Sequence, residues 1–581
     1  MNIPLRAYWR LLLTYLKPQR TRVGLLAALL LGSIGLQLGS PQVVRYFIDT
    51  ASAGGAVRAL LLAAALYILM ALGQRVVAYF AFYLGENTGW IATNALRSDL
   101  TRHCLRLDMP FHKQRTPGEL IERIDGDVSV LATFFSRLVI NVLGNTLLVL
   151  GILVVLFVTN PLAGLALAGY TVVTIASLGV FGRAAVARWA GSRAASADSY
   201  GFIEERLGGT EDIRGNGGEA YVLRRLDALL RVLVRKRRDA EMASNLTFML
   251  TKFLFALGYA VGLGVGAYLY THGQISIGTA YLIVFYIGMV GTPLDTIREH
   301  TQDLRQATAS IQRVEELRAI APEVRETPRT TLPAGALAVE FRAVTFGYEE
   351  GDSALRAVSL RLEPGQVLGL LGRTGSGKTT LSRLLFRLYD PSAGAIALGG
   401  VDPRDVALAD LRQQVGMVTQ EVQLFQASIR DNLTFFDAHI PDARIERILR
   451  ELGLDDWYSA LPAGLDTPLA AGGQGLSAGQ AQLLAFARVF LRDPGLVILD
   501  EASSRLDPAT EHLLERAMDR LLAERTAIVI AHRLRTVRRA DAIAILEDGA
   551  LVEYGPREQL ARDPASRFSA LLRTGLEEAL V

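Results

Sequence analysis

Residues 366–380 of the chain read QVLGLLGRTGSGKTT, and this stretch decides the fold of the C-terminal half. The apolar run Gln366–Leu371 predicts a short buried strand, and the pattern from Leu381 to Leu388 predicts a helix. The loop between them has the spacing G-x-x-x-x-G-K-T, in the strand–loop–helix setting that this motif requires. Its glycines let backbone N–H groups converge on phosphate oxygens, and the following helix adds its positive N-terminal end. The stretch therefore predicts a site for nucleotide phosphates.

Two side chains of this loop carry charge and metal chemistry. Lys378 is placed to reach the β- and γ-phosphates of ATP, and the Thr379 hydroxyl is placed to ligate Mg²⁺. We therefore expect ATP and Mg²⁺ as cofactors. The loop residues that we expect to contact the nucleotide are Gly372, Thr374, Gly375, Ser376, Gly377, Lys378, Thr379 and Thr380.

A second apolar run, Gly495–Leu499, ends in Asp500 and Glu501. An uninterrupted Leu-Val-Ile-Leu is typical of a strand covered on both faces, and open α/β sheets bind ligands at the carboxyl ends of their strands. We expect Asp500 to hold Mg²⁺, directly or through water, and Glu501 to polarise the water that attacks ATP. A helix N-cap role for either carboxylate is the alternative.

Between these motifs, Gly475–Gln482 reads GLSAGQAQ and opens a predicted helix that runs to about Leu491. Ser477 and Gln480 have the S-x-x-Q spacing of a capping box, so the segment has a purely structural interpretation. The order and spacing of the motifs favour a functional one. The glycine-rich loop, the Leu-Ser-x-Gly-Gln signature, the strand ending in Asp-Glu and a later Ala-His-Arg resemble the ATPase domains of ABC transporters.

The resemblance implies roles for residues that the local pattern leaves open. Tyr348 would stack on adenine, Gln420 would couple Mg²⁺ and the attacking water to the membrane domain, and His532 would contact the γ-phosphate. Without the resemblance, His532 reads as a solvated or core histidine, and Tyr348 and Gln420 read as ordinary strand residues. The expected catalytic residues are Glu501, His532 and Gln420, and the expected metal ligands are Thr379, Gln420 and Asp500.

The signature segment is expected to act on a second chain. The residues that would complete the opposing subunit's nucleotide site are Ser477, Gly479 and Gln480, with the helix N-terminus pointing at the γ-phosphate. Asp507 would lie at the dimer seam. The chain departs from the family pattern at Ala478, Ala481 and Arg505. A chain that keeps Glu501 but has an altered signature is expected to pair with a different half-transporter, and a homodimer is the alternative.

The composition divides the chain into a lipid half and a water half. Of the 581 residues 50% are hydrophobic and only 20% are charged. The mean hydropathy is +0.27, and the apolar excess lies in the first 300 residues, which indicates a membrane portion. Cys104 is the single cysteine, which excludes an intramolecular disulfide framework and a thiolate metal cluster. The net charge of +3 is small and scattered, so we expect no nucleic-acid partner.

Six stretches approach the roughly 20 apolar residues that cross a bilayer. They are Val23–Val43, Ala59–Tyr83, Val139–Val158, Pro161–Gly179, Phe248–Leu269 and Gly278–Leu294. Basic residues stay on the cytoplasmic side, and here they precede the first stretch and fill the connections after the second and fourth. We therefore expect a multi-pass protein of the cell membrane with a cytoplasmic N-terminus and C-terminal domain. We expect no secretory signal, and residues 5–17 predict an amphipathic helix on the inner surface.

The two long basic connections, of roughly 50 to 60 residues each, predict helices that continue beyond the membrane, bend and return. Their turning points read Met109-Pro110-Phe111-His112, followed by Thr116–Leu120, and Glu204–Arg214. Alone, either segment is a surface loop. With the family resemblance, both are similar to the coupling helices that dock onto nucleotide-binding domains.

Two ionisable residues, Arg75 and Lys252, lie at or near membrane depth. A charge there is costly and usually faces a cavity, which predicts a contact in the translocation pathway. Snorkelling or pairing between helices is the alternative, and it applies above all to Lys252, near the interface.

Six spans followed by such an ATPase resemble a type IV, B-type half-exporter over essentially the whole chain. The resemblance implies an all-α transmembrane domain (1–316), a linker (317–336) and an α/β ATPase domain (337–581). It implies ATP-driven export of an unidentified amphipathic substrate, whether small molecule, lipid or peptide, by alternating access. An ATP-gated or regulatory membrane protein without transport is the alternative. A soluble ABC ATPase and an importer are disfavoured.

Overall fold

The computed structural model describes the chain except residues 1–10, 12, 327, 349–352, 474, 501–507, 532–536 and 575–581. The side chains of 135–139, 178–179, 181–186, 298–306, 471, 508–509 and 574 are also outside the description. The chain divides into two compact units. One comprises Met1–Leu105 and Pro117–Ile320, and the other comprises Arg106–Thr116 and Ala321–Val581. The predicted amphipathic helix at 5–17 lies mostly outside the described residues.

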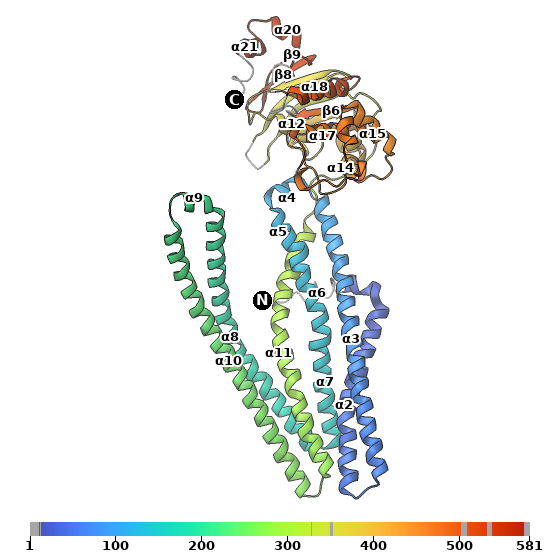
Figure 1. Cartoon of the computed structure of the whole chain (residues 1–581), viewed down its shortest axis with the longest axis vertical. Coiled ribbons are helices and arrows are strands. Elements are labelled where there is room, and N and C mark those ends of the chain that lie inside the picture. The colour runs from blue at the N-terminus through green and yellow to red at the C-terminus, as the bar shows by residue number, and fades with distance from the viewer. Residues whose placement is uncertain are drawn as a thin grey trace. The chain divides into compact units, whose positions relative to one another are not determined.

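Long helices build the first unit (Figure 1). The long elements are α2 (Arg20–Ser52), α3 (Val57–Arg106), α7 (Gly144–Thr159), α8 (Pro161–Gly208), α10 (Glu219–Thr271) and α11 (Ile277–Ala319). The shorter ones are η1 (Lys17–Gln19), α5 (Pro117–Ile121), η2 (Glu122–Gly126), α6 (Asp127–Arg137), η3 (Leu138–Leu143) and α9 (Thr210–Gly215). A helix satisfies every backbone N–H and C=O group internally, which a segment in lipid requires.

The apolar stretches all fall within these helices. Among the described residues, five segments are long and apolar enough to cross a membrane: in α2, α3, α10, α11, and Ile140–Thr159, which joins η3 to α7. The sixth, in α8, is apolar over the shorter stretch Pro161–Ser177. The unit therefore has the helical transmembrane character that the sequence predicts.

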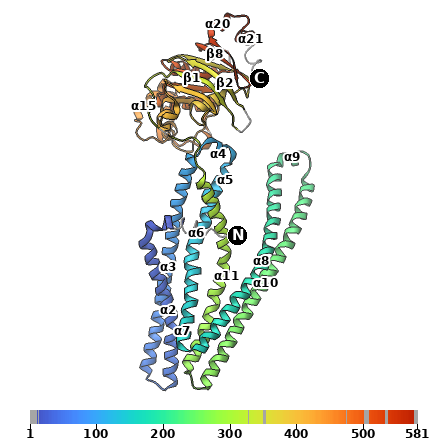
Figure 2. The ribbon, with the colours of Figure 1, turned by 180° about the vertical axis from the view of Figure 1, so that it is seen from behind.

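The helices α8 and α10 run side by side, with α9 at the end of the pair (Figures 1 and 2). Glycines on the buried face of α10 allow close packing. A Cβ at Gly258 would lie 2.6 Å from the Tyr170 ring, and one at Gly262 would lie 2.7 Å from Ile287. Small residues let helix backbones approach closely where lipid offers no hydrophobic driving force. This face therefore fixes α10 against α8 and α11.

Short helices occupy both predicted turning points. The helix α4 (Met109–Gln114) follows Asp108 as N-cap residue and has Pro110 in its first turn, where the missing N–H would be unpaired in any case. The helix α9 follows Gly209 and carries Glu211 and Asp212 in its first turn. The two predicted turning points are thus helical.

Two sheets form the framework of the second unit. The strands are β1 (Val339–Phe346), β2 (Leu355–Leu362), β3 (Val367–Leu371), β4 (Ala393–Leu398), β5 (Val415–Val418), β6 (Leu496–Asp500), β7 (Thr526–Ile530), β8 (Ala542–Glu547) and β9 (Ala550–Pro556). A three-stranded antiparallel sheet has the order β2-β1-β4, and a six-stranded sheet has the order β5-β6-β7-β3-β8-β9. All neighbours in the larger sheet are parallel except β8 and β9.

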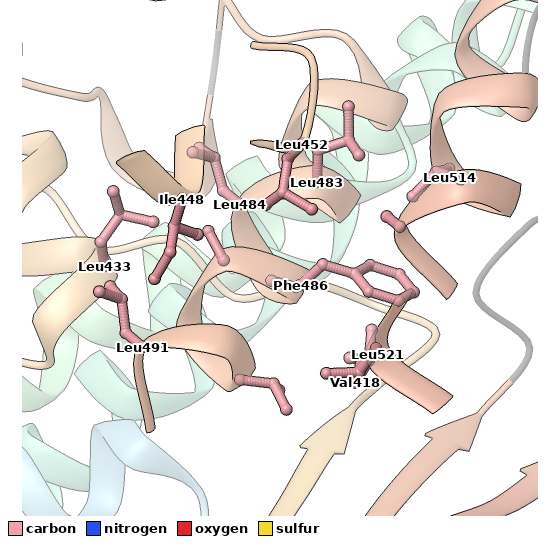
Figure 3. Packing of buried hydrophobic residues seen from close by; sticks show 14 of the residues in the cluster. Val418, Leu433, Ile448, Leu452, Leu483, Leu484, Phe486, Leu491, Leu514 and Leu521 are labelled. Atoms are coloured by element: carbon pink, nitrogen blue, oxygen red, sulfur yellow. The ribbon is translucent and has the colours of Figure 1, made fainter. Parts of the chain in front are cut away.

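Helices accompany the two sheets in this unit. They are α12 (Lys378–Leu385), α13 (Leu408–Gln414), α14 (Ile429–Thr434), α15 (Asp442–Glu451), α16 (Asp455–Ser459), α17 (Ala478–Arg492), α18 (Pro508–Leu522), α20 (Arg557–Arg562) and α21 (Arg567–Thr574), with single helical turns at η4 (Pro403–Asp405), η5 (Gly464–Asp466) and η6 (Ala471–Gly473). Figure 3 shows Phe486 and Leu484 of α17 packed among Leu433, Ile448 and Leu521 from the surrounding helices. This core fixes α17, which carries the signature, against the sheet.

Candidate functional site

The glycine-rich loop follows β3, which lies inside the larger sheet and is buried along its whole length. Two of its glycines have backbone conformations that side chains rarely adopt, with φ of 148° at Gly372 and 103° at Gly377. A Cβ at Gly372 would lie 2.3 Å from the Leu546 carbonyl oxygen, and one at Gly377 would lie 2.6 Å from that of Ala354. The loop can therefore hold this curved conformation only with glycine at both positions.

Lys378 opens α12 and is only 6% exposed. Its ammonium donates to the carbonyl oxygens of Gly372, at 2.6 Å, and of Arg373, at 2.9 Å. Within the described part of the chain, the buried Ser376 Oγ has no hydrogen-bond partner. An ammonium held at the loop and a buried hydroxyl without a partner fit a group rich in oxygen acceptors, as a polyphosphate is.

The three predicted metal ligands lie in one cavity with Lys378. The cavity has a volume of about 880 Å³, and Thr379, Gln420 and Asp500 all line it. Parallel register explains the convergence, because β3, β5 and β6 end at the same edge of the sheet. One carboxylate, one hydroxyl and one amide oxygen suit Mg²⁺, which keeps waters and phosphate oxygens among its ligands. The described residues hold no cluster of three or more His, Cys, Asp or Glu that would favour another metal.

The ring of Tyr348 is fixed at the rim of this cavity. Its hydroxyl lies 3.0 Å from Thr380 Oγ1 and accepts a hydrogen bond from Arg383 Nη1, also at 3.0 Å. The rings of Phe346 and Tyr389 meet it edge-on, with centroid distances of 5.1 and 5.2 Å. Burial raises the pKa of Tyr389, so this neighbour stays a neutral phenol. An aromatic face held in this way can stack on a nucleotide base.

The signature residues lie apart from this cavity. Ser477 Oγ accepts from the Gln480 backbone N–H at 3.1 Å, and Gln480 Oε1 accepts from the Ser477 N–H at 2.9 Å, so the predicted capping box is present. A Cβ at Gly479 would lie 1.9 Å from Thr510, which explains the glycine. None of these three residues lines the cavity around Lys378. One chain therefore does not bring its own signature to its own glycine-rich loop.

Several residues at or near the site were not predicted from the sequence. Gln482 Nε2 donates to the Gln420 carbonyl oxygen at 2.9 Å, which ties α17 to the loop after β5. Arg383 also lines the cavity. It follows Thr380 by three positions on the same helix, and this spacing could have predicted that both side chains lie on one face. Arg356 and Asp548 also line the cavity, and no local signal marks them, because β2 and the β8–β9 turn bring them there. Glu501 and His532, together with Arg505 and Asp507, lie outside the described residues.

Comparison with known proteins agrees with this arrangement. Residues 23–294 match the family model described as "ABC transporter transmembrane region", and residues 355–504 match "ABC transporter". The chain is 31% identical over 561 residues to the "Uncharacterized ABC transporter ATP-binding protein YknV" of Bacillus subtilis, covering 95% of this chain and 92% of that protein. It is 31% identical over 558 residues to the "ATP-dependent lipid A-core flippase" of Cupriavidus metallidurans, covering 94% and 92% of the two.

A solved structure shares the fold. The structure of "a bacterial Atm1-family ABC exporter with ATP bound" matches with a TM-score of 0.80 at 24% identity, over 96% of this chain and 98% of that one. At 24% identity the match shows that the two chains share the arrangement of helices and sheets.

Proposed function

Because the chain belongs to the ABC transporter family, with a transmembrane region and an ATPase domain fused in one polypeptide, we propose that it exports an amphipathic substrate as half of a heterodimer. The family membership makes it an ATP hydrolase coupled to transport across a membrane, of the exporter type that works as a dimer. The finer statements concern the ATP chemistry, the partner and the substrate. The convergence of Lys378, Thr379, Gln420 and Asp500 in one cavity supports the ATP chemistry.

The ATP site assigns a task to each of these groups. Lys378 would hold the β- and γ-phosphates. Thr379, Gln420 and Asp500 would hold Mg²⁺, which would neutralise charge that develops on the phosphate oxygens. Tyr348 stacks on adenine, and the backbone around Gly372 and Gly377 receives phosphate oxygens through its N–H groups. Glu501 polarises the attacking water and His532 contacts the γ-phosphate, both by position in the sequence.

The partner follows from the separation of the signature from the loop. Ser477 and Gly479 do not line the cavity of their own chain, which supports a second chain that receives them at its own ATP site. The departures at Ala478, Ala481 and Arg505 favour a different half-transporter as that chain. ATP held between the two nucleotide-binding domains pulls them together and opens the pathway outward, and hydrolysis resets it.

A groove between α8 and α10 supports an amphipathic substrate. It has a volume of about 910 Å³, and its lining includes Arg188, Lys236, the carboxylate of Asp239 and the apolar side chains of Met242, Leu246 and Met249. Among the described residues, neither Arg188 nor Lys236 has an ion pair or hydrogen bond. By the positive-inside rule we expect Arg188 and Lys236 to lie nearer the cytoplasm and the apolar side chains nearer the membrane. A molecule with an anionic head and an apolar body fits this order, as does the lipid that gives the flippase relative its name.

The test measures the ATPase rate of the reconstituted complex against a panel of amphiphiles. We expect phosphatidylglycerol and palmitate to stimulate the rate at lower concentrations than zwitterionic phosphatidylcholine. Replacing both cations, R188Q with K236Q, should raise the half-maximal concentration by roughly tenfold or more, since each charge-assisted contact contributes about 1.5–3 kcal/mol. The control is Arg231→Gln, a basic residue of α10 that is paired with Asp227. Equal stimulation by all headgroups, or no change in the double variant, would refute an anionic substrate at this groove.

A further inference from the structure

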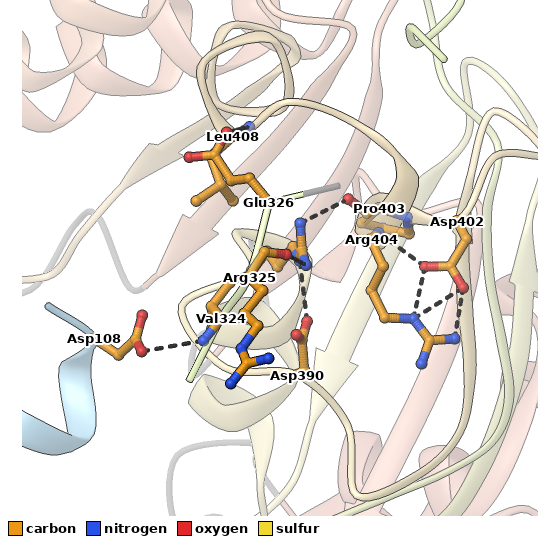
Figure 4. A network of polar contacts seen from close by, with 10 residues as sticks. Asp108, Val324, Arg325, Glu326, Asp390, Asp402, Pro403, Arg404 and Leu408 are labelled. Carbon is orange, nitrogen blue, oxygen red and sulfur yellow. Dashed lines mark hydrogen bonds and ion pairs between the residues drawn. The ribbon is translucent and has the colours of Figure 1, made fainter. Parts of the chain in front are cut away.

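The segment Arg106–Thr116 continues from α3 but belongs to the same compact unit as the ATP site. At its start, Asp108 accepts hydrogen bonds from the backbone N–H groups of Glu323 and Val324. Figure 4 shows the bond from Val324, which is 3.1 Å long. We call the segment after α11 that contains Glu323, Val324 and Arg325 the strap. The carbonyl oxygen of Arg325 accepts a hydrogen bond from Arg387 at 2.8 Å. Arg387 is itself buried and paired with Asp390. The helix α4 is therefore held on the ATPase fold at its N-terminal end.

From the other end of α4, Lys113 reaches Tyr348. Its ammonium lies 4.6 Å from the centroid of the Tyr348 ring, within the range of a cation–π contact. Among the described residues, Lys113 has no ion pair or hydrogen bond, so the ring is its contact. The ring cannot turn away easily, because its hydroxyl bonds Thr380 and Arg383.

The two sides of this contact differ. Tyr348 is among the residues that line the nucleotide cavity and Lys113 is not, so the ring connects the ammonium to the cavity without Lys113 itself lining it. We propose that Lys113 is a positioning residue, which holds Tyr348 for adenine and thereby couples the segment Arg106–Thr116 to occupancy of the ATP site. This inference rests on the proposed role of Tyr348.

The coupling follows from linkage. If the contact of the ammonium with the ring favours adenine stacking on Tyr348, then bound adenine favours the contact between Lys113 and the ring by the same factor. An exposed cation–π contact is worth about 0.5–1 kcal/mol, which corresponds to about a two- to five-fold change in ATP affinity. Arg383 also lies over the ring, at 5.9 Å, but it sits on α12 and moves with the site.

The experiment is a double-mutant cycle in the full-length reconstituted complex, with equilibrium binding of ATP and of inorganic tripolyphosphate as readouts. Lys113→Met should weaken ATP binding by about two- to five-fold and leave tripolyphosphate binding unchanged, because tripolyphosphate has no base. Lys113→Arg should restore ATP affinity. In a Tyr348→Leu background, Lys113→Met should have no further effect.

A matched control lies on the same segment. Arg115 lies 4.7 Å from the Phe111 ring, a contact of the same kind that does not involve Tyr348, so Arg115→Met should leave ATP affinity unchanged. If Lys113→Met weakens both ligands equally, or weakens ATP further without Tyr348, the inference falls. If Tyr348→Leu itself binds ATP like wild type, the proposed adenine role falls as well. If Tyr348→Leu weakens ATP binding while Lys113→Met binds ATP like wild type, the coupling through Lys113 is overturned and the adenine role of Tyr348 stands.

Discussion

The Lys378 ammonium shows how the loop keeps a charge ready in a buried place. Two carbonyl oxygens of its own loop satisfy it, at 2.6 and 2.9 Å, while Ser376 Oγ nearby has no partner among the described residues. A buried ammonium without acceptors would be costly, so the loop carbonyls stabilise the charged form until phosphate oxygens replace them. The residue is thus committed to phosphate recognition by geometry as well as by charge.

This geometry predicts the effect of removing the charge. Lys378→Ala should weaken ATP binding by roughly ten- to a hundred-fold, because a hydrogen bond to a charged group is worth about 1.5–3 kcal/mol. Binding of labelled ATP to the purified protein measures it. Arg404→Gln, which removes an exposed partner of Asp402 away from the cavity, serves as the control. Wild-type affinity in Lys378→Ala would show that the phosphates bind elsewhere.

At the residue scale, the sequence predicts those site residues that belong to short motifs of neighbouring positions. The glycine-rich loop, Asp500 and the signature are short motifs, and the structure brings Thr379, Gln420 and Asp500 into one cavity. Lys113 and Asp548 could not be predicted, since their place at the site depends on contacts between segments far apart in the chain. Glu501 and His532 stay predictions.

Among the elements, α6 and α11 are joined by an ion pair whose carboxylate is buried and whose guanidinium is half-exposed. Asp127, whose side chain is 2% exposed, accepts from Arg313 Nε at 2.8 Å and from Ser310 Oγ at 2.8 Å. This carboxylate raises the pKa of Arg313. The pair fixes α11 where it leaves the membrane portion and approaches the second unit along the chain.

Breaking this pair should destabilise the helical unit. Asp127→Asn should lower stability by on the order of 1–3 kcal/mol, because the half-exposed guanidinium keeps some access to water while Ser310 loses a charged acceptor. The melting temperature of the detergent-purified protein should fall. As the control, Glu316→Gln changes a carboxylate of α11 that accepts a hydrogen bond from the exposed Gln312, and it should leave the melting temperature unchanged. An unaltered melting temperature in Asp127→Asn would contradict the role.

The order of the helices also predicts which turns face outward. Ala53, between α2 and α3, and Gln274, between α10 and α11, are exposed and belong to connections nearly free of basic residues. Cysteines placed there should react with an impermeant maleimide from outside intact cells, and one at Arg237 should react only after permeabilisation. The native Cys104 is buried, which keeps the background low. The reverse labelling pattern would overturn the orientation.

The six apolar stretches predict the long helices well, because length and hydropathy are local properties. The π-helical turns Glu122–Gly126 and Leu138–Leu143 have no such signal, since they depend on how α6 meets its neighbours. The short helix α4 could be predicted from Pro110, whereas its attachment to the strap after α11 could not.

At the scale of the whole molecule, the signature residues lie apart from the ATP cavity of their own chain, so a partner chain is expected. We expect a heterodimer with a half-transporter whose residue equivalent to Glu501 is not Glu. Native mass spectrometry of the detergent-solubilised complex, after co-expression with a homologous half-transporter encoded by a neighbouring gene, measures its composition. A pure homodimer with full ATPase activity, formed in the presence of that chain, would sink the proposal.

ATP-driven export requires that ATP hydrolysis moves a molecule across the membrane. The direct measurement is flux of the most stimulating anionic amphiphile, carrying a fluorophore quenched from outside, in proteoliposomes that contain the complex. With Mg²⁺ and ATP, the wild-type complex should move the probe, and Glu501→Gln should slow both flux and hydrolysis by on the order of 10² while ATP still binds. Flux that is independent of ATP, or equal in Glu501→Gln and wild type, would contradict ATP-driven export.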